Sequence, residues 1–321
     1  MQKNRDLTIA LRVYPGIAKT FPKDFSFGEK INLIEASLFS LLKACGNLKV
    51  KLIVIADSCP KDYYTAINNV TQRFAIDKFQ YINVDFASNR DTFIKQVMVL
   101  LNERSDYLMF AEDDYLYKDS AITKCIDVME DNRHIDYITP YDHPDHYSLP
   151  IHLPLRGDIP TLSNGIEWRG VGSTTCTFLT RKKILGQDKK DFLSYRKPSL
   201  KKNCKYVGSD IHIFLRLTKK TLFRAHLYFF YFLKSTRIGK RIGGDYLAKV
   251  LFPNYQVSVP GLKKLIDVWL CDECDLIERL RKKTRTLYAP KANIATHLCK
   301  NFIHSQREWL RLYKKLIKEL R

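Results

Sequence analysis

The stretch from Tyr107 to Tyr117, which reads Y-L-M-F-A-E-D-D-Y-L-Y, restricts the possible folds of this chain more than any other. Its first five residues, Tyr107 to Ala111, form an apolar run of the length of a strand that is buried on both faces. Three consecutive carboxylates follow, Glu112, Asp113 and Asp114. Because such a strand excludes charge, we expect the acids at its carboxyl end, where open α/β sheets bind ligands.

The acidic triplet predicts a cation. Adjacent carboxylates repel one another and are stabilised by a positive charge close to them. Carboxylate oxygens suit Mg²⁺ and Mn²⁺, and proteins often share these ions with the phosphates of a substrate. We therefore predict a site for a metal and a phosphate at the end of this strand, with Mn²⁺ or Mg²⁺ as the cofactor. An acidic turn without a ligand is the alternative.

Strands and helices are predicted to alternate through the first part of the chain. Strand-like runs are separated by segments in which apolar residues recur at helical spacing. The predicted strands are Leu7–Val13, Val50–Ala56, Phe79–Val84 and Tyr107–Ala111, and the predicted helices between them are Ile31–Ala44, Tyr63–Phe74 and Thr92–Asn102. This alternation predicts an α/β fold in which helices flank a mostly parallel sheet.

The charge of the chain indicates an anionic partner. It contains 54 Lys and Arg against 34 Asp and Glu, a net charge of +20, which favours nucleic acid, an anionic membrane or a phosphate-bearing substrate. Thr218–Leu251 is basic and rich in aromatic residues, and Ser305–Arg321 is a basic amphipathic helix. Interfacial helices have this composition, so we expect contact with an anionic membrane surface. Ordinary helices packed on the core are the alternative.

The expected location follows from the first residues and the cysteines. Met1–Thr8 is polar and charged, unlike a signal peptide. The eight cysteines are scattered, which is typical of reduced thiols in the cytosol. No apolar run is long enough to cross a bilayer. We therefore expect a cytoplasmic protein that is peripheral on the inner face of the cell membrane.

Three places in the chain resemble the GT-A glycosyltransferases, in particular the family 2 type that builds bacterial surface polysaccharides. The first is L-I-V-I-A-D-S at Leu52–Ser58. The second is Asn89-Arg90-Asp91 before a helix, followed by A-E-D-D at Ala111–Asp114, which is similar to the D-x-D element of the family. The third is A-T-H at Ala295–His297, because several GT-A enzymes use a late histidine as a metal ligand.

The resemblance implies a GT-A fold and a metal-dependent, inverting transfer of a sugar. The donor would be a nucleoside-diphosphate sugar, and the acceptor a hydroxyl of a glycan or glycolipid in cell-surface polysaccharide synthesis. We expect residues 1–217 to form the catalytic GT-A domain, and residues 218–321 to form a basic helical region that completes the active site with His297. The implied donor-binding residues are Asp57, which would contact the base, together with Asn89, Arg90, Glu112 and Asp113.

Further roles are expected for residues beyond the donor site. The resemblance implies that Asp114 and His297 are the metal ligands. Asp210 follows a Gly-Ser turn at a predicted helix start, and we expect it to be the catalytic base that deprotonates the acceptor hydroxyl. The alternative for Asp210 is an acid that interacts with the helix dipole. Glu112 departs from the family pattern, which has Asp or a small residue at that position.

Four residues of the middle region are candidates for binding the acceptor or the diphosphate. Trp168 and Arg169 have side chains that can stack on a sugar ring and hold a phosphate, although a buried Trp beside a surface Arg is the alternative. Thr174 and Thr175 offer hydroxyl groups, although an ordinary strand of small polar residues is the alternative. His143 and His146 favour a loop of the substrate pocket over a zinc site, because no other ligands are clear.

Two other functions remain open at this point. A nucleotidyltransferase also needs carboxylates, a metal and a basic surface. A nucleic-acid-binding protein would account for the net charge and for the aromatic residues among the basic ones. We disfavour the latter because a binding module does not need three acids at the end of a strand. The chain contains neither G-x-x-x-x-G-K-S/T nor G-x-G-x-x-G, which disfavours P-loop kinases and Rossmann dehydrogenases.

Overall fold

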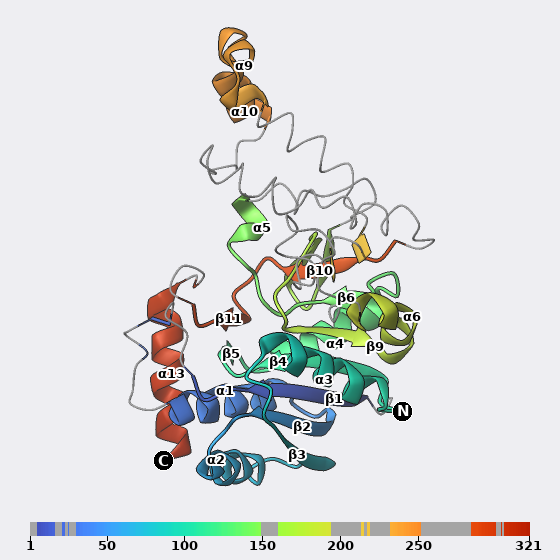
Figure 1. Cartoon of the computed structure of the whole chain (residues 1–321), viewed down its shortest axis with the longest axis vertical. Helices are drawn as coiled ribbons and strands as arrows, with labels where there is room; N and C mark the ends of the chain where they lie inside the picture. The colour runs from blue at the N-terminus through green and yellow to red at the C-terminus, as the bar shows by residue number, and fades with distance from the viewer. Residues whose placement is uncertain are drawn as a thin grey trace.

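The structure is a computed structural model that describes residues 5–16, 21–22, 25, 30–148, 160–193, 213–214, 217–218, 232–251, 284–299, 303 and 305–321. Half of its main sheet is parallel (Figure 1). This half has the order β3-β2-β1-β4, and each pair of neighbours is parallel. The strands are β1 (Asp6–Val13), β2 (Lys49–Asp57), β3 (Lys78–Val84) and β4 (Tyr107–Glu112). All four predicted strands are confirmed.

Helices connect these strands and cover the sheet. Apolar side chains at helical spacing form the buried face of the first of them, with Ile34, Leu38 and Leu41 fully buried. Ser88 begins the third helix, because its hydroxyl accepts a hydrogen bond from the backbone N–H of Asp91 at 3.3 Å. The helices are α1 (Lys30–Ala44), α2 (Lys61–Thr71) and α3 (Asn89–Leu101), close to the predicted positions.

The other half of the main sheet is mixed. Its first strand, β9 (Phe178–Arg181), pairs antiparallel with β4, and Phe178 stacks on Phe110 at 4.4 Å between ring centroids. The full order is β3-β2-β1-β4-β9-β6-β10-β8-β7, in which only β6 and β10 of this half are parallel. The remaining strands are β6 (Tyr137–Ile138), β7 (Thr161–Ser163), β8 (Ile166–Gly170) and β10 (Leu287–Pro290). The helices of this region are α4 (Ala121–Asp131), α5 (Asp145–Ser148) and α6 (Lys182–Leu193).

A second, two-stranded sheet brings a late segment of the chain beside the acidic triplet. β5 (Tyr115–Tyr117) directly follows the acids and pairs antiparallel with β11 (Ala295–His297). The register places His297 opposite Tyr115. This pairing fixes the position of His297 at the end of β4, although the two segments are distant in the sequence.

The last helix packs on the first. α13 (Gln306–Leu320) lies beside α1 (Figure 1) and buries Trp309, Tyr313 and Leu316, which are at most 1% exposed. The apolar face that the sequence suggests for a membrane surface is therefore covered by the protein core. Among the described helices, none combines the length and the apolar character needed to cross a bilayer.

Two short helices lie apart from the sheet. α9 (Arg237–Arg241) and α10 (Gly244–Leu251) are at the end of the molecule opposite α2 (Figure 1). They belong to the basic segment Thr218–Leu251, of which residues 219–231 lie outside the described part of the chain. The predicted boundary between residues 1–217 and 218–321 stays a prediction. β10, β11 and α13, which follow that boundary, pack against elements that precede it.

A buried ionic network joins the late chain to the mixed half of the sheet. Asp188 of α6 is 1% exposed and accepts hydrogen bonds from Arg285 Nε at 2.8 Å and from the hydroxyl of Tyr137 at 2.6 Å. Arg285 Nη1 also lies 3.6 Å from Asp136. Burial raises the pKa of Asp136 despite hydrogen bonds and charges that lower it. The network holds the start of β10 against α6 and β6.

Candidate active site

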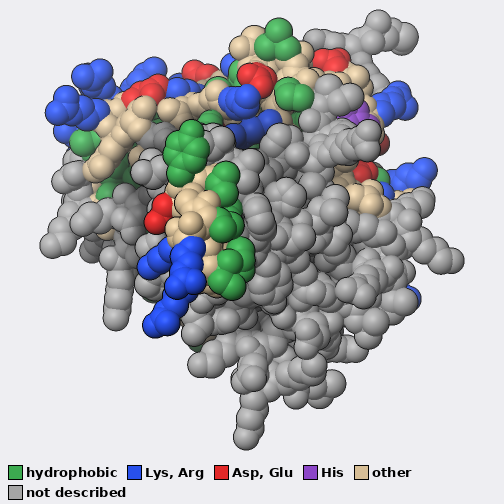
Figure 2. All heavy atoms as spheres, turned by 90° about the horizontal axis from the view of Figure 1, so that it is seen from above, with side chains coloured by type: hydrophobic (Ala, Val, Ile, Leu, Met, Phe, Trp, Pro, Cys, Tyr) green, Lys and Arg blue, Asp and Glu red, His purple; other side chains and the backbone are tan. Residues whose placement is uncertain are grey.

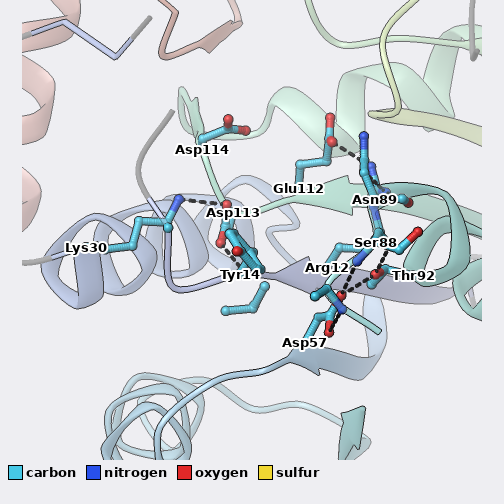
Figure 3. Close-up of a pocket in the computed structure, with 13 residues that line it drawn as sticks. Arg12, Tyr14, Lys30, Asp57, Ser88, Asn89, Thr92, Glu112, Asp113 and Asp114 are labelled. Carbon is cyan, nitrogen blue, oxygen red and sulfur yellow. Dashed lines mark hydrogen bonds and ion pairs between the residues drawn. The ribbon is translucent and has the colours of Figure 1, made fainter. Parts of the chain in front are cut away.

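A cavity of about 490 Å³ lies at the carboxyl ends of β1, β2 and β4 (Figure 3). Its wall also includes the N-terminal end of α3 and the first residue of α1. Cavities of this volume accept small-molecule ligands. Its position is the one at which open α/β sheets bind ligands, because the loops that leave neighbouring parallel strands meet there. The acidic triplet forms one side of the cavity, as predicted.

Each carboxylate of the triplet has a different positively charged partner. Glu112 pairs with Arg12 of β1 at 2.5 Å. Asp113 pairs with Lys30 of α1 at 2.9 Å, and Asp114 is 3.1 Å from His297 of β11. The protein itself therefore supplies a positively charged side chain for each of the three acids, from β1, α1 and β11.

Arg12 connects three elements below the cavity. Its side chain is 6% exposed, and Arg12 and Glu112 are directly paired in the register of β1 and β4. Arg12 Nη1 also donates to the backbone oxygen of Asn89 at 3.0 Å and to its side-chain oxygen at 2.5 Å. Asn89 is the first residue of α3, so Arg12 ties that helix to both strands. The side chain of Glu112 is long enough to reach Arg12 and complete this connection.

Asp113 is fixed from two sides. Its side chain accepts a hydrogen bond from Lys30 Nζ at 2.9 Å and another from the backbone N–H of Tyr14 at 2.9 Å. Burial raises the pKa of Asp113, while the charge of Lys30 acts in the opposite direction. Both partners hold the carboxylate in the wall of the cavity.

Asp114 and His297 meet across 183 residues of sequence. The His297 ring stacks on Tyr115 at 4.8 Å with 6° between the planes, and the Tyr115 hydroxyl is 2.5 Å from Thr175 Oγ1. Burial lowers the pKa of His297, but attraction to Asp114 outweighs it and raises this pKa to about 9. Burial raises the pKa of Asp114, but the charge and hydrogen bond of His297 outweigh it and lower this pKa.

Once His297 has released its proton, the Asp114–His297 pair has the donor atoms that a Mn²⁺ ion accepts. Asp114 Oδ1 and His297 Nδ1 are buried, and neither has a hydrogen-bond partner among the described residues. A carboxylate oxygen together with an imidazole nitrogen suits Mn²⁺ better than Mg²⁺, which prefers oxygen ligands. Over the described part of the chain, no group of three or more His, Cys, Asp and Glu is arranged to hold a metal. The remaining ligands would be donor phosphates and water, and metal binding stays a prediction.

Asp57 organises the loop between β3 and α3. Its carboxylate is 2% exposed and accepts backbone hydrogen bonds from Phe86 at 2.8 Å and Ala87 at 3.0 Å. It also accepts a bond from the Thr92 hydroxyl at 2.7 Å. Burial alone would raise the pKa of Asp57, but these hydrogen bonds outweigh it and lower the pKa. The predicted contact with a nucleotide base would use a carboxylate that already has these partners, and it stays a prediction.

Three other predicted donor and acceptor residues do not line the cavity. Arg90 has 48% of its side chain exposed, and its guanidinium is 3.7 Å from Asp91. Trp168 is fully buried in the core on β8, so its ring is not accessible for stacking on a sugar in this structure. Arg169 donates to Asp142 at 3.0 Å and lies over the Tyr147 ring at 3.9 Å. None of these three residues lines the cavity.

The remaining candidates from the sequence are two threonines, the expected base and two histidines. Thr174 is 7% exposed and does not line the cavity, whereas Thr175 reaches the site indirectly through Tyr115. Asp210, the expected base, lies outside the described residues. His143 and His146 are buried beside each other, with 5.9 Å between their ring centroids.

Sequence reasoning missed the two cations that line the cavity, Arg12 and Lys30. Arg12 could have been noticed, because it is the one charged side chain within the run Leu7–Val13 and a buried charge needs a partner. Lys30 could not, because no local pattern distinguishes it from the other lysines. Tyr14, Ser88 and Thr92 were also missed, although they line the same cavity.

Comparison with known proteins gives only distant likenesses. No family model matches the chain, and no curated protein matches it. The chain is similar to the crystal structure of S. aureus TarS, with 10% identity and a TM-score of 0.35 over 57% of this chain and 29% of that one.

Two further solved structures show the same level of similarity. One is glucosyl-3-phosphoglycerate synthase from Mycobacterium tuberculosis in complex with Mn²⁺, UDP-glucose and phosphoglyceric acid, with 8% identity and a TM-score of 0.36 over 69% of this chain and 68% of that one. The other is 4-diphosphocytidyl-2C-methyl-D-erythritolsynthase from Anaerococcus prevotii, with 9% identity and a TM-score of 0.36 over 62% and 81%. Likeness at this level assigns no activity to the chain.

Proposed function

We propose that this chain is a glycosyltransferase that moves a sugar from a nucleoside-diphosphate sugar to a hydroxyl of a glycan or glycolipid in cell-surface polysaccharide synthesis. One observation carries the proposal: Asp114 and His297, 183 residues apart, meet beside a cavity at the strand ends. A carboxylate and an imidazole at that position suit a metal shared with a diphosphate. The D-x-D-like triplet and the late A-T-H segment of the sequence agree with this chemistry.

The residues of the site would have distinct roles in the reaction. Asp114 and His297 would hold Mn²⁺, whose chemistry there is to stabilise negative charge on the leaving diphosphate. Arg12 keeps Glu112 and the start of α3 in place, and Asp57 keeps the loop that forms the opposite wall. Preorganised groups of this kind need no rearrangement when charge develops. Asp210 is our candidate for the base that takes the acceptor proton, and we expect inversion at the transferred carbon.

A thermal-shift screen with UDP-, GDP- and CMP-sugars in the presence of Mn²⁺ tests the proposal. A donor that binds only the folded protein at 100 times its Kd should stabilise it by about 2.7 kcal/mol. Asp114→Asn should lose the part of the shift that depends on Mn²⁺. Asp119→Asn is a matched control, because Asp119 is 67% exposed and should leave the shift unchanged. Absence of a shift with every sugar nucleotide would contradict the proposal.

The product of turnover separates this proposal from its nearest rival. A glycosyltransferase releases a nucleoside diphosphate, whereas a nucleotidyltransferase releases pyrophosphate. A nucleic-acid-binding protein would show salt-sensitive binding to DNA or RNA and no shift with sugar nucleotides. The acidic triplet in the cavity wall favours an enzyme over a nucleic-acid-binding protein, because a binding module does not need three acids at the end of a strand.

A cytoplasmic location, peripheral on an anionic inner membrane face, is also part of the proposal. At the tip formed by α9 and α10, Ile238, Ile242 and Tyr246 are 63%, 54% and 73% exposed, beside Arg237, Lys240 and Arg241. Figure 2 looks down on this end of the molecule, where Lys and Arg side chains adjoin hydrophobic ones. Interfacial helices combine these two properties, and each basic residue contributes about 1 kcal/mol at an anionic surface.

Liposome flotation tests this membrane contact. We expect the full chain to float with vesicles that contain anionic lipid and to remain unbound with neutral vesicles. Ile242→Ser should weaken the flotation, because it removes exposed apolar area from the tip. Leu162→Ser is a control, since Leu162 is 76% exposed on β7, outside the tip. Equal recovery with both kinds of vesicle would reject the contact.

A further inference from the structure

The charges in the cavity wall do not favour an anionic ligand without assistance. Four carboxylates line it, from Asp57, Glu112, Asp113 and Asp114, against two cationic side chains, Arg12 and Lys30. A diphosphate brought into this wall would be repelled by the carboxylates unless a cation contacts it directly. One of the two cations must therefore be available to the ligand, or a metal must supply all the neutralisation.

Arg12 already donates hydrogen bonds to other residues of the protein. Its two terminal nitrogens donate to Glu112 and to both oxygens of Asn89, which fixes the guanidinium beneath the cavity. Removing it from these partners would leave the partly buried Glu112 without its cation and would release the start of α3. Arg12 is therefore a residue that positions the wall.

Lys30 has spare hydrogen-bonding capacity. An ammonium group has three N–H donors, and among the described residues only Asp113 accepts one of them. Lys30 is 8% exposed and lines the cavity, so the ammonium group is within the wall that a ligand would contact. Figure 3 shows Lys30 reaching toward Asp113, the residue before Asp114. A buried, incompletely bonded cation in a cavity wall is a binding group for an anion.

We infer that Lys30 binds the diphosphate of the donor directly, so that donor affinity has a component that does not require a metal. In the ligand-free state Asp113 occupies Lys30 and competes with the phosphate for it. This inference rests on the proposed function and extends it, because it assigns a phosphate ligand from α1, which the sequence did not single out. It predicts opposite effects for the two members of the pair, since loss of Lys30 weakens phosphate binding and loss of the Asp113 charge strengthens it.

Isothermal titration of the full chain with inorganic pyrophosphate and with UDP, in EDTA, tests this inference. The wild type should bind both, and Lys30→Gln should bind at least about tenfold more weakly, because a charge-assisted hydrogen bond is lost. Asp113→Asn should bind more tightly than the wild type. Lys43→Gln makes the same change on the same helix at an exposed ion pair with Glu319, and it should leave the affinity unchanged.

A variant with both changes, Lys30→Gln with Asp113→Asn, guards against misfolding, because the two amides can still bond each other without a buried charge. The inference would be overturned if both Lys30 variants bound pyrophosphate and UDP with affinities within twofold of wild type. In that case, binding of a sugar nucleotide with Mn²⁺ would still support the proposed function. Lys30-dependent binding of pyrophosphate without binding of any sugar nucleotide would overturn the proposed function instead. A wild type that binds none of these ligands would reject both.

Discussion

The carboxylate of Asp57 gives the sharpest prediction about stability, because it holds the loop that forms one wall of the cavity. Asp57→Asn retains the shape of the side chain and removes its charge. The bonds from the backbone N–H groups of Phe86 and Ala87 would then be neutral, and each would lose about 1 kcal/mol. The new amide would also direct an N–H toward that of Ser88, which now lies 3.4 Å from Asp57 Oδ2, at a further cost of about 1 kcal/mol.

We therefore expect Asp57→Asn to lower the free energy of unfolding by about 3 kcal/mol at pH 7. Urea unfolding measures it as a change of midpoint at constant slope. Asp77→Asn is the matched control: its side chain is 51% exposed and 3.7 Å from Lys49, so it should cost less than about 1 kcal/mol. Equal effects of the two variants would refute the structural role of Asp57.

The difference in unfolding free energy between wild type and Asp57→Asn should depend on pH with a definite sign. Because the pKa of Asp57 is lowered in the folded protein, its contribution is fully present above the ordinary pKa of about 4 and is lost as pH falls through the folded value. The difference between wild type and Asp57→Asn should be constant from about pH 5 to 8 and should shrink below about pH 4. A difference that grows on acidification would contradict this assignment.

Three further predictions concern the metal pair, the last helix and the buried network. His297→Ala should need much more Mn²⁺ for activity or lose activity, and an unchanged Mn²⁺ titration at full activity would limit His297 to a structural role. Trp309→Ala should lower the free energy of unfolding by about 3–5 kcal/mol because the ring is fully buried against the core, while Arg307→Ala on the exposed side of α13 should change it little. Asp188→Ala should cost about 3–5 kcal/mol, because it leaves Arg285 without its hydrogen-bonded acid, and a urea midpoint close to wild type would contradict this.

The parallel half of the sheet could be predicted from the sequence because its strands are long and apolar. β4 ends at Glu112, within one residue of the predicted end, and its acids lie at the predicted edge. The mixed half could not be predicted in the same way. β6 and β7 have two and three residues, too few for a periodic pattern. β10 pairs with strands more than 100 residues earlier in the chain, and local sequence carries no information about such pairings.

The site was predictable only in part for a related reason. A run of acids is visible in the sequence, but the partner of Glu112 follows from the pairing of β1 with β4, and the partner of Asp113 comes from α1. The proximity of His297 to Asp114 was expected from a family resemblance and not from the residues alone. Trp168 was a candidate for stacking on a sugar, but it is buried in the core. The sequence alone does not distinguish a tryptophan that lines a pocket from one that packs in the core.

Hydrogen exchange of the full chain, with and without a mixture of UDP-, GDP- and CMP-sugars and Mn²⁺, tests the central proposal most directly because it locates the binding site. We expect slower exchange in residues 85–92, in residues 112–117 and in β11, which surround the cavity and the Asp114–His297 pair. Asp114→Asn should reduce this protection. Protection confined to α9 and α10, or no protection at the cavity with any sugar nucleotide, would contradict a nucleotide-sugar site at the ends of these strands.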